Sequence, residues 1–441
     1  MMSEEPAFKP TRSQGLAALA DFVPRAGGAY ARGRNSDPGP DGRHAVSRLS
    51  PYLRHRLLHE REVVSAVLSA HSLEACEKFV QEVFWRSYFK GFLEHHPALW
   101  STYCKERDAA YGEAAASAGL RTGLTEAIHG RTGIECFDVW AAELRATGYL
   151  HNHARMWFTS IWIFTLQLPW QLGADFFMRH LIDGDPASNT LSWRWVAGLH
   201  TKGKHYLARA ENITRFTEGR FNPVGQLNEN ADALVEAEAP RRAPLDFAHP
   251  KPAQDDGSRC FLLTDEDLCD GLSALEERFR ASKMARMPVR VAVVDLSAGR
   301  TSDCASGALD VSQEGAAVAC RSPRDQFVQG ARLDASDRIK AALGAETKMF
   351  CATDTDALCA WLAEGATTEI LMPYPTQGPA FAFAHTLSPQ LGAHGLTLTH
   401  WLSEYDRLAW PHADRGFFRL KTRIAELVRV QGLQAETSTL L

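Results

Sequence analysis

Residues 181–195 read Leu-Ile-Asp-Gly-Asp-Pro-Ala-Ser-Asn-Thr-Leu-Ser-Trp-Arg-Trp, and this stretch decides how the first half of the chain is interpreted. An Asp-Gly-Asp-Pro sequence is typical of a turn whose carboxylates cap the helix that follows. A buried Asp also needs a cationic partner, and Arg155 is available for that role. One interpretation is a capped core helix with an ion pair. The other is a cavity for a planar, polar-edged ligand, because Trp, Asn and Arg positions converge in a mostly apolar helical region.

The chain around this stretch is predicted to be helical over residues 1–220. Apolar residues recur at three- and four-residue spacing through 73–95, which predicts one long amphipathic helix. Further helices are expected at about 137–147, 151–169, 171–182 and 186–199, separated by Thr-Gly, Leu-Pro-Trp and Asp-Gly-Asp-Pro. Residues 221–256 are rich in Pro, Ala and acidic residues without a clear period, and they are interpreted as a linker.

Residues 257–441 have a different texture, in which short apolar runs alternate with helical patterns. The expected strands are 260–264, 289–296, 317–320, 349–353, 369–374 and 396–401. The expected helices are 265–282, 324–343, 355–364 and 378–392. This alternation predicts an α/β, Rossmann-like domain with a doubly wound parallel sheet. The segment holds neither a G-x-G-x-x-G nor a Walker sequence, so a nucleotide there is unsupported.

Composition fits a globular protein of two or three domains, with 441 residues, 45% hydrophobic and 23% charged. Residues 1–220 carry 26 Lys and Arg against 23 Asp and Glu, whereas residues 221–441 carry 22 against 30. The longest apolar stretch, 156–170, is too short and too polar to span a bilayer. The acidic N-terminus has no apolar leader region, and the nine cysteines are scattered. We therefore expect a cytoplasmic protein with reduced thiols and no metal site.

Seven motifs in residues 10–200 resemble the FAD-binding helical domain of the photolyase/cryptochrome family. They are Tyr30-x-x-x-Arg34, 47–53 (SRLSPYL), 82–89 (EVFWRSYF), 132–133 (TG), 147–152 (TGYLHN), 181–185 (LIDGD), and Asn189 with Trp193-x-Trp195. The motifs follow the family's order. The domain order differs, because the family usually has an α/β antenna domain before the flavin domain, and here the α/β domain follows it.

The resemblance implies that FAD is the cofactor and assigns residues to it. Its phosphates and ribose would be held by Tyr30 and by Ser47, Arg48, Leu49 and Ser50, with hydroxyls and backbone N–H groups as donors. Val46 stands where the family commonly has Thr, so one phosphate hydrogen bond is expected to be missing. The isoalloxazine edge would be flanked by Asp183, Gly184 and Asp185, with Arg155 paired to Asp183. Arg86 would belong to the same cofactor site, and the Asn189 amide would face the flavin N5 as donor or acceptor.

On the substrate side, Glu82, Trp85, Asn152 and Met156 match the pocket that receives a flipped-out cyclobutane pyrimidine dimer in the DNA-repairing members. Trp85 would provide an aromatic wall, and Glu82 and Asn152 would hydrogen-bond the base edges. Arg34 would reach a DNA phosphate. His153 departs from the usual Arg, and the segment after Trp195 departs from the common pattern of this branch. The cysteines of the iron-sulfur branch are absent, so no Fe–S cluster is expected.

Electron supply also departs from the family. Trp193 and Trp170 match the inner two members of a three-tryptophan relay, but the outer position falls near Ser117. Trp157, Tyr111 or Trp140 could take that role, and the sequence leaves the choice open. It also leaves open whether an antenna chromophore is bound.

Two functions follow from the resemblance. One is a blue-light-driven, FAD-dependent DNA photolyase that splits dimers in single- or double-stranded UV-damaged DNA. The other is a cryptochrome-like photoreceptor without repair activity. The retained lesion-pocket residues favour repair, whereas the weakly basic charge and His153 favour signalling. A light-independent flavin-binding protein is a third, less favoured interpretation.

Overall fold

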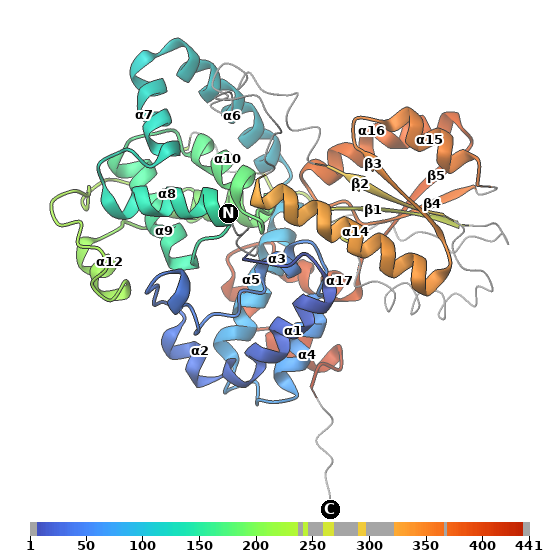
Figure 1. The fold of residues 1–441 in the computed structure, drawn as a ribbon, viewed down its shortest axis with the longest axis horizontal. Coiled ribbons are helices and arrows are strands. Elements are labelled where there is room, and N and C mark those ends of the chain that lie inside the picture. The colour runs from blue at the N-terminus through green and yellow to red at the C-terminus, as the bar shows by residue number, and fades with distance from the viewer. Residues whose placement is uncertain are drawn as a thin grey trace, which may run out of the picture.

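The computed structural model describes residues 7–236, 241–245, 259–268, 290–296, 322–365 and 368–434. Up to residue 236 the regular elements are helices (Figure 1). The α-helices are α1 (Arg12–Phe22), α2 (Gly28–Gly33), α3 (Ser50–Arg54), α4 (Glu60–Leu68), α5 (Glu77–His95), α6 (Ala98–Ala116), α7 (Ala118–His129), α8 (Glu135–Thr147), α9 (Asn152–Ser160), α10 (Trp170–His180), α11 (Pro186–Ala197) and α12 (Ala210–Phe216). Short turns lie at Val23–Arg25, Pro40–Gly42 and, as a π-helical turn, Ile161–Thr165.

Local signals explain where these helices begin and end. Pro186 is the first residue of α11, and Asp185 caps it by accepting hydrogen bonds from the backbone of Ala187 and Ser188. Gly148 ends α8 in the left-handed conformation that glycine adopts without strain. The long predicted helix begins at Glu77 rather than at residue 73, because residues 73–76 form a turn before it.

The α/β part is a five-stranded parallel sheet in the order β3-β2-β1-β4-β5. Its strands are β1 (Arg259–Thr264), β2 (Arg290–Asp295), β3 (Glu346–Cys351), β4 (Glu369–Pro373) and β5 (Thr397–Trp401). Helices α15 (Thr355–Ala363) and α16 (Pro379–Ala393) cover one face, and α14 (Pro323–Leu343) lies across the other (Figure 1). The predicted α/β fold class is thus confirmed. The strand expected at 317–320 and most of the helix expected at 265–282 lie outside the described residues.

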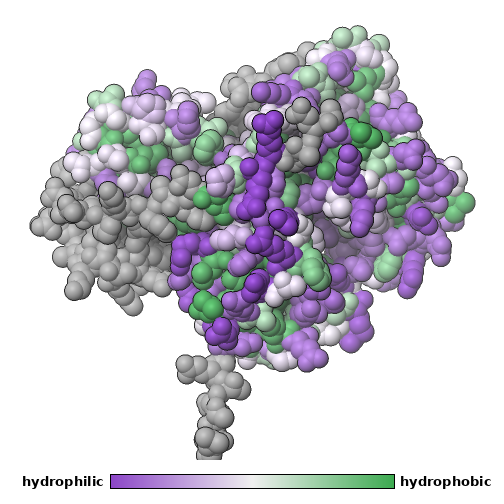
Figure 2. All heavy atoms as spheres, turned by 180° about the vertical axis from the view of Figure 1, so that it is seen from behind, coloured by the Kyte–Doolittle hydropathy of each residue, from purple (hydrophilic) through white to green (hydrophobic). Residues whose placement is uncertain are grey.

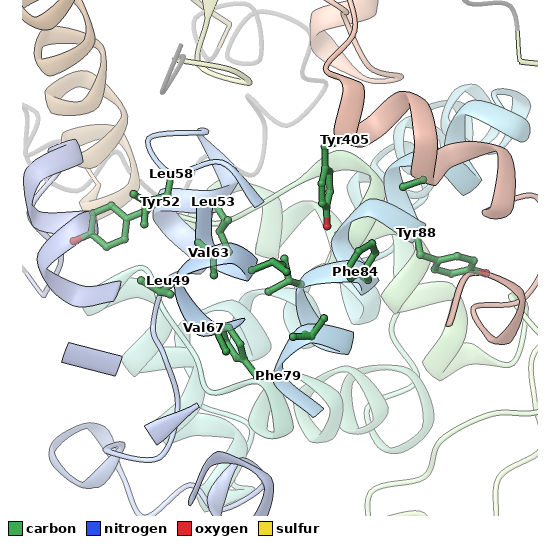
Figure 3. Packing of buried hydrophobic residues seen from close by; sticks show 14 of the residues in the cluster. Leu49, Tyr52, Leu53, Leu58, Val63, Val67, Phe79, Phe84, Tyr88 and Tyr405 are labelled. Carbon is green, nitrogen blue, oxygen red and sulfur yellow. The ribbon is translucent and has the colours of Figure 1, made fainter. Parts of the chain in front are cut away.

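After β5 the chain returns to the helical part. Helix α17 (Glu404–Ala409), the turn Trp410–His412, α18 (Phe418–Lys421) and α19 (Ile424–Val430) share one hydrophobic core with α1, α4 and α5. Tyr405 of α17 packs on Phe84 of α5 with ring centroids 5.5 Å apart (Figure 3). A Cβ atom at Gly91 would lie 2.8 Å from the Cβ atom of Ala413 and 2.9 Å from Trp410, so only glycine allows this approach.

Buried ion pairs join the sheet to the helical part at the carboxyl end of β1. The Arg54 guanidinium donates two hydrogen bonds to Glu266, at 2.9 and 2.6 Å, and a third to the carbonyl of Gly184. Arg56 pairs with Asp267 and Asp406. A small cavity of about 30 Å³ lies among these side chains, Lys90 and Thr376. The charges are therefore packed against each other with little free space.

None of the helices in the described ranges has the length and apolar character needed to cross a bilayer. Figure 2 shows hydrophilic and hydrophobic residues interspersed over the face seen from behind.

Trp410 tests whether the returning C-terminal helices stabilise the helical part. Its side chain is fully buried in the shared core, so Trp410→Ala should lower the free energy of unfolding by about 3–5 kcal/mol. Urea denaturation followed by far-UV circular dichroism measures this change. Phe418→Ala is the matched control, because Phe418 is 75% exposed and should change the same quantity by less than about 0.5 kcal/mol. Equal effects of the two substitutions would contradict a shared core.

Candidate functional site

The turn at residues 183–185 is the centre of the site that the sequence predicts. One carboxylate oxygen of Asp185 caps α11 at 3.0 and 2.9 Å, and the other accepts a 2.8 Å hydrogen bond from Arg86 on α5. Burial opposes ionisation, but the charges of Arg86, Lys90 and Arg54 outweigh it and hold the pKa of Asp185 far below its ordinary value. Asp185 is therefore an anchoring carboxylate, and its contacts go to the protein.

Asp183 has a different environment. One of its oxygens accepts a 2.9 Å hydrogen bond from Arg155, whose side chain also donates to the carbonyl of Leu150. The other oxygen, Oδ1, is buried and has no hydrogen-bond partner among the described residues. A buried acceptor without a partner costs free energy unless a ligand or water satisfies it. The structure thus brings Arg155 and Asp183 together as predicted and leaves one oxygen available to a polar-edged ligand.

Asn189 lies one turn into α11, on the same helix as the cap. Its side-chain amide donates a 2.8 Å hydrogen bond to the carbonyl of Ala174 on α10, and the residue is buried. This contact holds the amide in one orientation. Gly184 is also buried, and a Cβ there would lie 3.1 Å from the Leu181 carbonyl oxygen, so the turn packs tightly behind Asp183.

The expected phosphate-binding loop lies before α3. Arg48 adopts a left-handed φ of 53°, and its guanidinium lies over the rings of Phe8 and Tyr149, 4.7 and 5.9 Å from their centroids. Ser47 is half-buried, Leu49 is buried and Ser50 is exposed at the start of α3. Because α3 spans only five residues, its N-terminus is a weak anion site. The hydroxyls of Ser47 and Ser50 are the groups of this loop that are predicted to bind a phosphate.

Tyr30, Arg34 and Glu82 lie at the contact between α2 and α5. Arg34 donates a short hydrogen bond to Glu82 of α5, which joins the end of α2 to α5. Tyr30 is buried and packs edge-on against Phe79, with ring centroids 5.3 Å apart. Burial, together with the Glu82 charge, raises the pKa of Tyr30 above its ordinary value. Tyr30 is therefore a neutral hydroxyl at neutral pH.

The remaining predicted lesion-pocket residues are only partly covered. Asn152 is exposed on the first turn of α9, and Met156 is half-buried one turn later on the same helix. Trp85 is half-buried, but Phe417 stacks on one face of its ring, with centroids 3.8 Å apart and planes inclined by 15°. Phe417 was not predicted from the sequence, because nothing in its local pattern indicates that it returns to α5.

The two predicted relay tryptophans, Trp170 and Trp193, are buried in a hydrophobic core separate from the one that α1, α4 and α5 share. Trp193 contacts Trp162 and Phe177 at ring-centroid distances of 6.1 and 5.1 Å. Gly173 is required beside it, since a Cβ there would lie 2.2 Å from the Trp193 ring. Trp193 Nε1 is buried without a hydrogen-bond partner in the part of the chain that the structure describes.

The ring that stacks on Trp170 is Tyr103 of α6, with centroids 5.6 Å apart, and Tyr103 in turn contacts Trp100 at 5.4 Å. The three outer candidates named from the sequence have other neighbours. Trp157 stacks on Trp140 and on His153, and the Tyr111 hydroxyl donates to Asp175. An i,i+3 pair of aromatics on α6 was the sequence signal that could have identified Trp100 and Tyr103.

Residues 79–230 match the family model described as the FAD binding domain of DNA photolyase. These residues form a domain of the photolyase/cryptochrome family. FAD is accordingly the cofactor of this domain. The unpartnered Asp183 oxygen, the oriented Asn189 amide and the two serine hydroxyls fit a ligand with a planar polar edge and phosphates. The roles of all these residues toward the cofactor stay predictions, and Tyr30 and residues 47–50 also precede the matched range.

Curated relatives match parts of the chain. The deoxyribodipyrimidine photo-lyase of Streptomyces griseus is 35% identical in an alignment of 182 positions, and the match covers 38% of this chain and 38% of the relative. An enzyme of the same name from Thermus thermophilus is 28% identical over 268 residues, 60% of this chain and 59% of the relative. Among solved structures, a bacterial class III photolyase from Agrobacterium tumefaciens is 27% identical, with a TM-score of 0.40 and coverage of 47% and 43%. The chain thus spans less than two thirds of the length of each of these relatives.

Asp183→Asn tests the assignment of the turn to the flavin. The substitution removes the charge that pairs with Arg155 and presents an N–H group where the site now offers an acceptor. Hydrogen bonds to charged groups contribute about 1.5–3 kcal/mol, so FAD should bind roughly 10- to 100-fold more weakly. The flavin-to-protein absorbance ratio after dilution and dialysis measures this loss.

Asp175→Asn is the matched control for that experiment. Asp175 also pairs with an arginine, Arg179, but its other carboxylate contact is the hydroxyl of Tyr111 on α6 and not a residue of the 183–185 turn. This variant should retain the flavin. Equal loss of flavin from both variants would show that Asp183 acts through the fold alone.

Proposed function

We propose that this protein is a blue-light-driven lyase that splits cyclobutane pyrimidine dimers in UV-damaged DNA by electron transfer from reduced FAD. The observation that carries the proposal is the ion pair of Arg34 with Glu82, one turn before Trp85 on α5, together with the exposed amide of Asn152 at the start of α9. A flipped-out dimer needs an aromatic wall and hydrogen-bonding groups for its base edges. Trp85 is such an aromatic residue, and Glu82 and Asn152 are such hydrogen-bonding groups. Asn152 is exposed, so packing of the fold does not explain its presence.

Each residue has a distinct part in this function. Reduced FAD, excited by light, supplies the electron that splits the cyclobutane ring. Arg34 holds the Glu82 carboxylate in one place, where it can accept hydrogen bonds from the bases or share a proton with them as negative charge develops. Trp85 provides the apolar wall that excludes water. Asn152 and Met156 approach from α9, the helix that also carries Arg155.

A cryptochrome-like photoreceptor is the alternative, and one contact favours it. Arg54 joins the carbonyl of Gly184, next to Asp183, directly to Glu266 of the α/β domain. A change of charge at the flavin would therefore act on a residue that bridges the two parts of the chain. A contact of this kind also stabilises a fold without any signalling role. The repair assay therefore decides between the two functions.

Repair is tested with a dimer-containing oligonucleotide under blue light and in the dark. Wild type with reduced flavin should restore the thymines only in the light. Trp85→Ala should weaken lesion binding about tenfold, since base–aromatic stacking contributes about 1–3 kcal/mol. Glu82→Gln should mainly lower the yield of splitting. Both variants should keep FAD, and a wild-type protein that holds flavin but splits no dimer would leave the photoreceptor as the better account.

Photoreduction of the oxidised flavin tests the relay. An isolated tryptophan radical takes its electron back quickly unless a further donor is within reach. Tyr103→Leu should therefore slow light-driven flavin reduction, as should Trp170→Phe and Trp193→Phe. Tyr111→Phe is the matched control and should leave the rate unchanged, because the hydroxyl of Tyr111 binds Asp175. A rate that depends on Tyr111 and not on Tyr103 would refute the route through Tyr103.

A further inference from the structure

Three exposed arginines surround one buried carboxylate at the start of the C-terminal helices. Arg242 Nη1 lies 2.8 Å from Asp414 Oδ2, Arg415 Nε lies 3.9 Å from the same oxygen, and Arg419 bonds Oδ1. The Asp414 side chain has no exposed surface, whereas those of the arginines are 51%, 77% and 48% exposed. One negative charge against three positive charges leaves an excess of two positive charges at the surface.

The neighbouring backbone fixes the position of these arginines. Ala413, just before Asp414, packs against Gly91 of α5, and Leu420, just after Arg419, is fully buried. Arg242 comes from a separate segment, which is held where the backbone N–H of Ala243 donates to the carbonyl of His95. A guanidinium cluster that is anchored in this way loses little conformational freedom when it binds an anion.

The cluster lies beside the proposed lesion pocket. Phe417, between Arg415 and Arg419, stacks on Trp85. Tyr88 lies one turn after Trp85 on α5. Burial and the negative charge of Asp414 raise the pKa of Tyr88, so Asp414 is close to Tyr88 as well. Phe418 points outward from the same segment and is 75% exposed. An exposed ring among arginines is the combination by which proteins hold single-stranded nucleic acid.

We propose that residues 414–419, together with Arg242, form a DNA-contacting surface that binds backbone phosphates next to the dimer. This inference rests on the proposed function and names the part of the substrate outside the dimer. Guanidinium groups bind phosphates with two parallel hydrogen bonds, and Phe418 packs on an adjacent base. The surface therefore recognises a strand that continues beyond the dimer, and a dinucleotide is too short to reach it.

The test compares two substrates: a dimer within an oligonucleotide of about 16 nucleotides, the upper end of single-strand site sizes, and the isolated dinucleotide dimer. Arg415→Gln removes the most exposed arginine and leaves Arg242 and Arg419 on Asp414. It should weaken oligonucleotide binding about three- to tenfold, and the slope of log Kd against log salt concentration should fall by about 0.7–0.9, as for one lost phosphate contact. Phe418→Ala should weaken oligonucleotide binding by a similar factor without changing that slope. Splitting of the dinucleotide dimer should be unchanged in both variants.

Arg121→Gln on α7, far from α5 in Figure 1, is the matched control and should change neither substrate's affinity. If Arg415→Gln and Phe418→Ala bind the oligonucleotide as wild type does, the proposed surface is wrong while the repair function stands. If both variants lose the two substrates equally, they act through the fold and the surface is again wrong. Tighter binding of polyglutamate than of the oligonucleotide would overturn the assignment to DNA. A wild type that splits neither substrate overturns the repair function itself.

Discussion

The carboxylate of Asp185 is the charge on which the arrangement of the molecule depends. It caps α11, accepts a hydrogen bond from Arg86 of α5, and lies 3.9 Å from both Arg54 and Lys90. A buried charge is tolerated only while its partners remain in place, and removing one partner typically costs about 3–5 kcal/mol. The turn that carries Asp183 is consequently held against α5 and against the sheet by the same group.

This dependence explains why the two parts of the chain form one unit despite the unusual domain order. Arg54 contacts Asp185, Gly184 and Glu266. The sheet is therefore attached at the 183–185 turn, next to the ion pair of Arg155 with Asp183. The C-terminal helices then return to the other side of α5 and bury Tyr405 and Trp410 there. The α/β domain is thus inserted between helical segments that share one core.

Local patterns in the sequence predicted much of this structure. The strands at β1, β2, β4 and β5 follow from short apolar runs, and the Arg155–Asp183 pair follows from the motif order. Long-range contacts could not be predicted, because no local period indicates where a distant segment packs. The stacking of Phe417 on Trp85 is of this kind. The return of residues 404–430 to α5 was missed for the same reason, since amphipathic helices fit a sheet equally well.

The attachment at β1 also determines what the sheet can do. In doubly wound parallel sheets, ligands usually bind in the crevice at the carboxyl ends of the strands where the strand order reverses, which in this sheet lies between β1 and β4. Here Glu266, Lys90 and Thr376 meet at that edge around a cavity of about 30 Å³, room for a water molecule and little more. Among the described residues, Arg56 and Lys90 of the helical part line the place where such a domain would ordinarily take a nucleotide. The edge of the sheet at which a ligand usually binds is therefore the edge that attaches the sheet to the helical part.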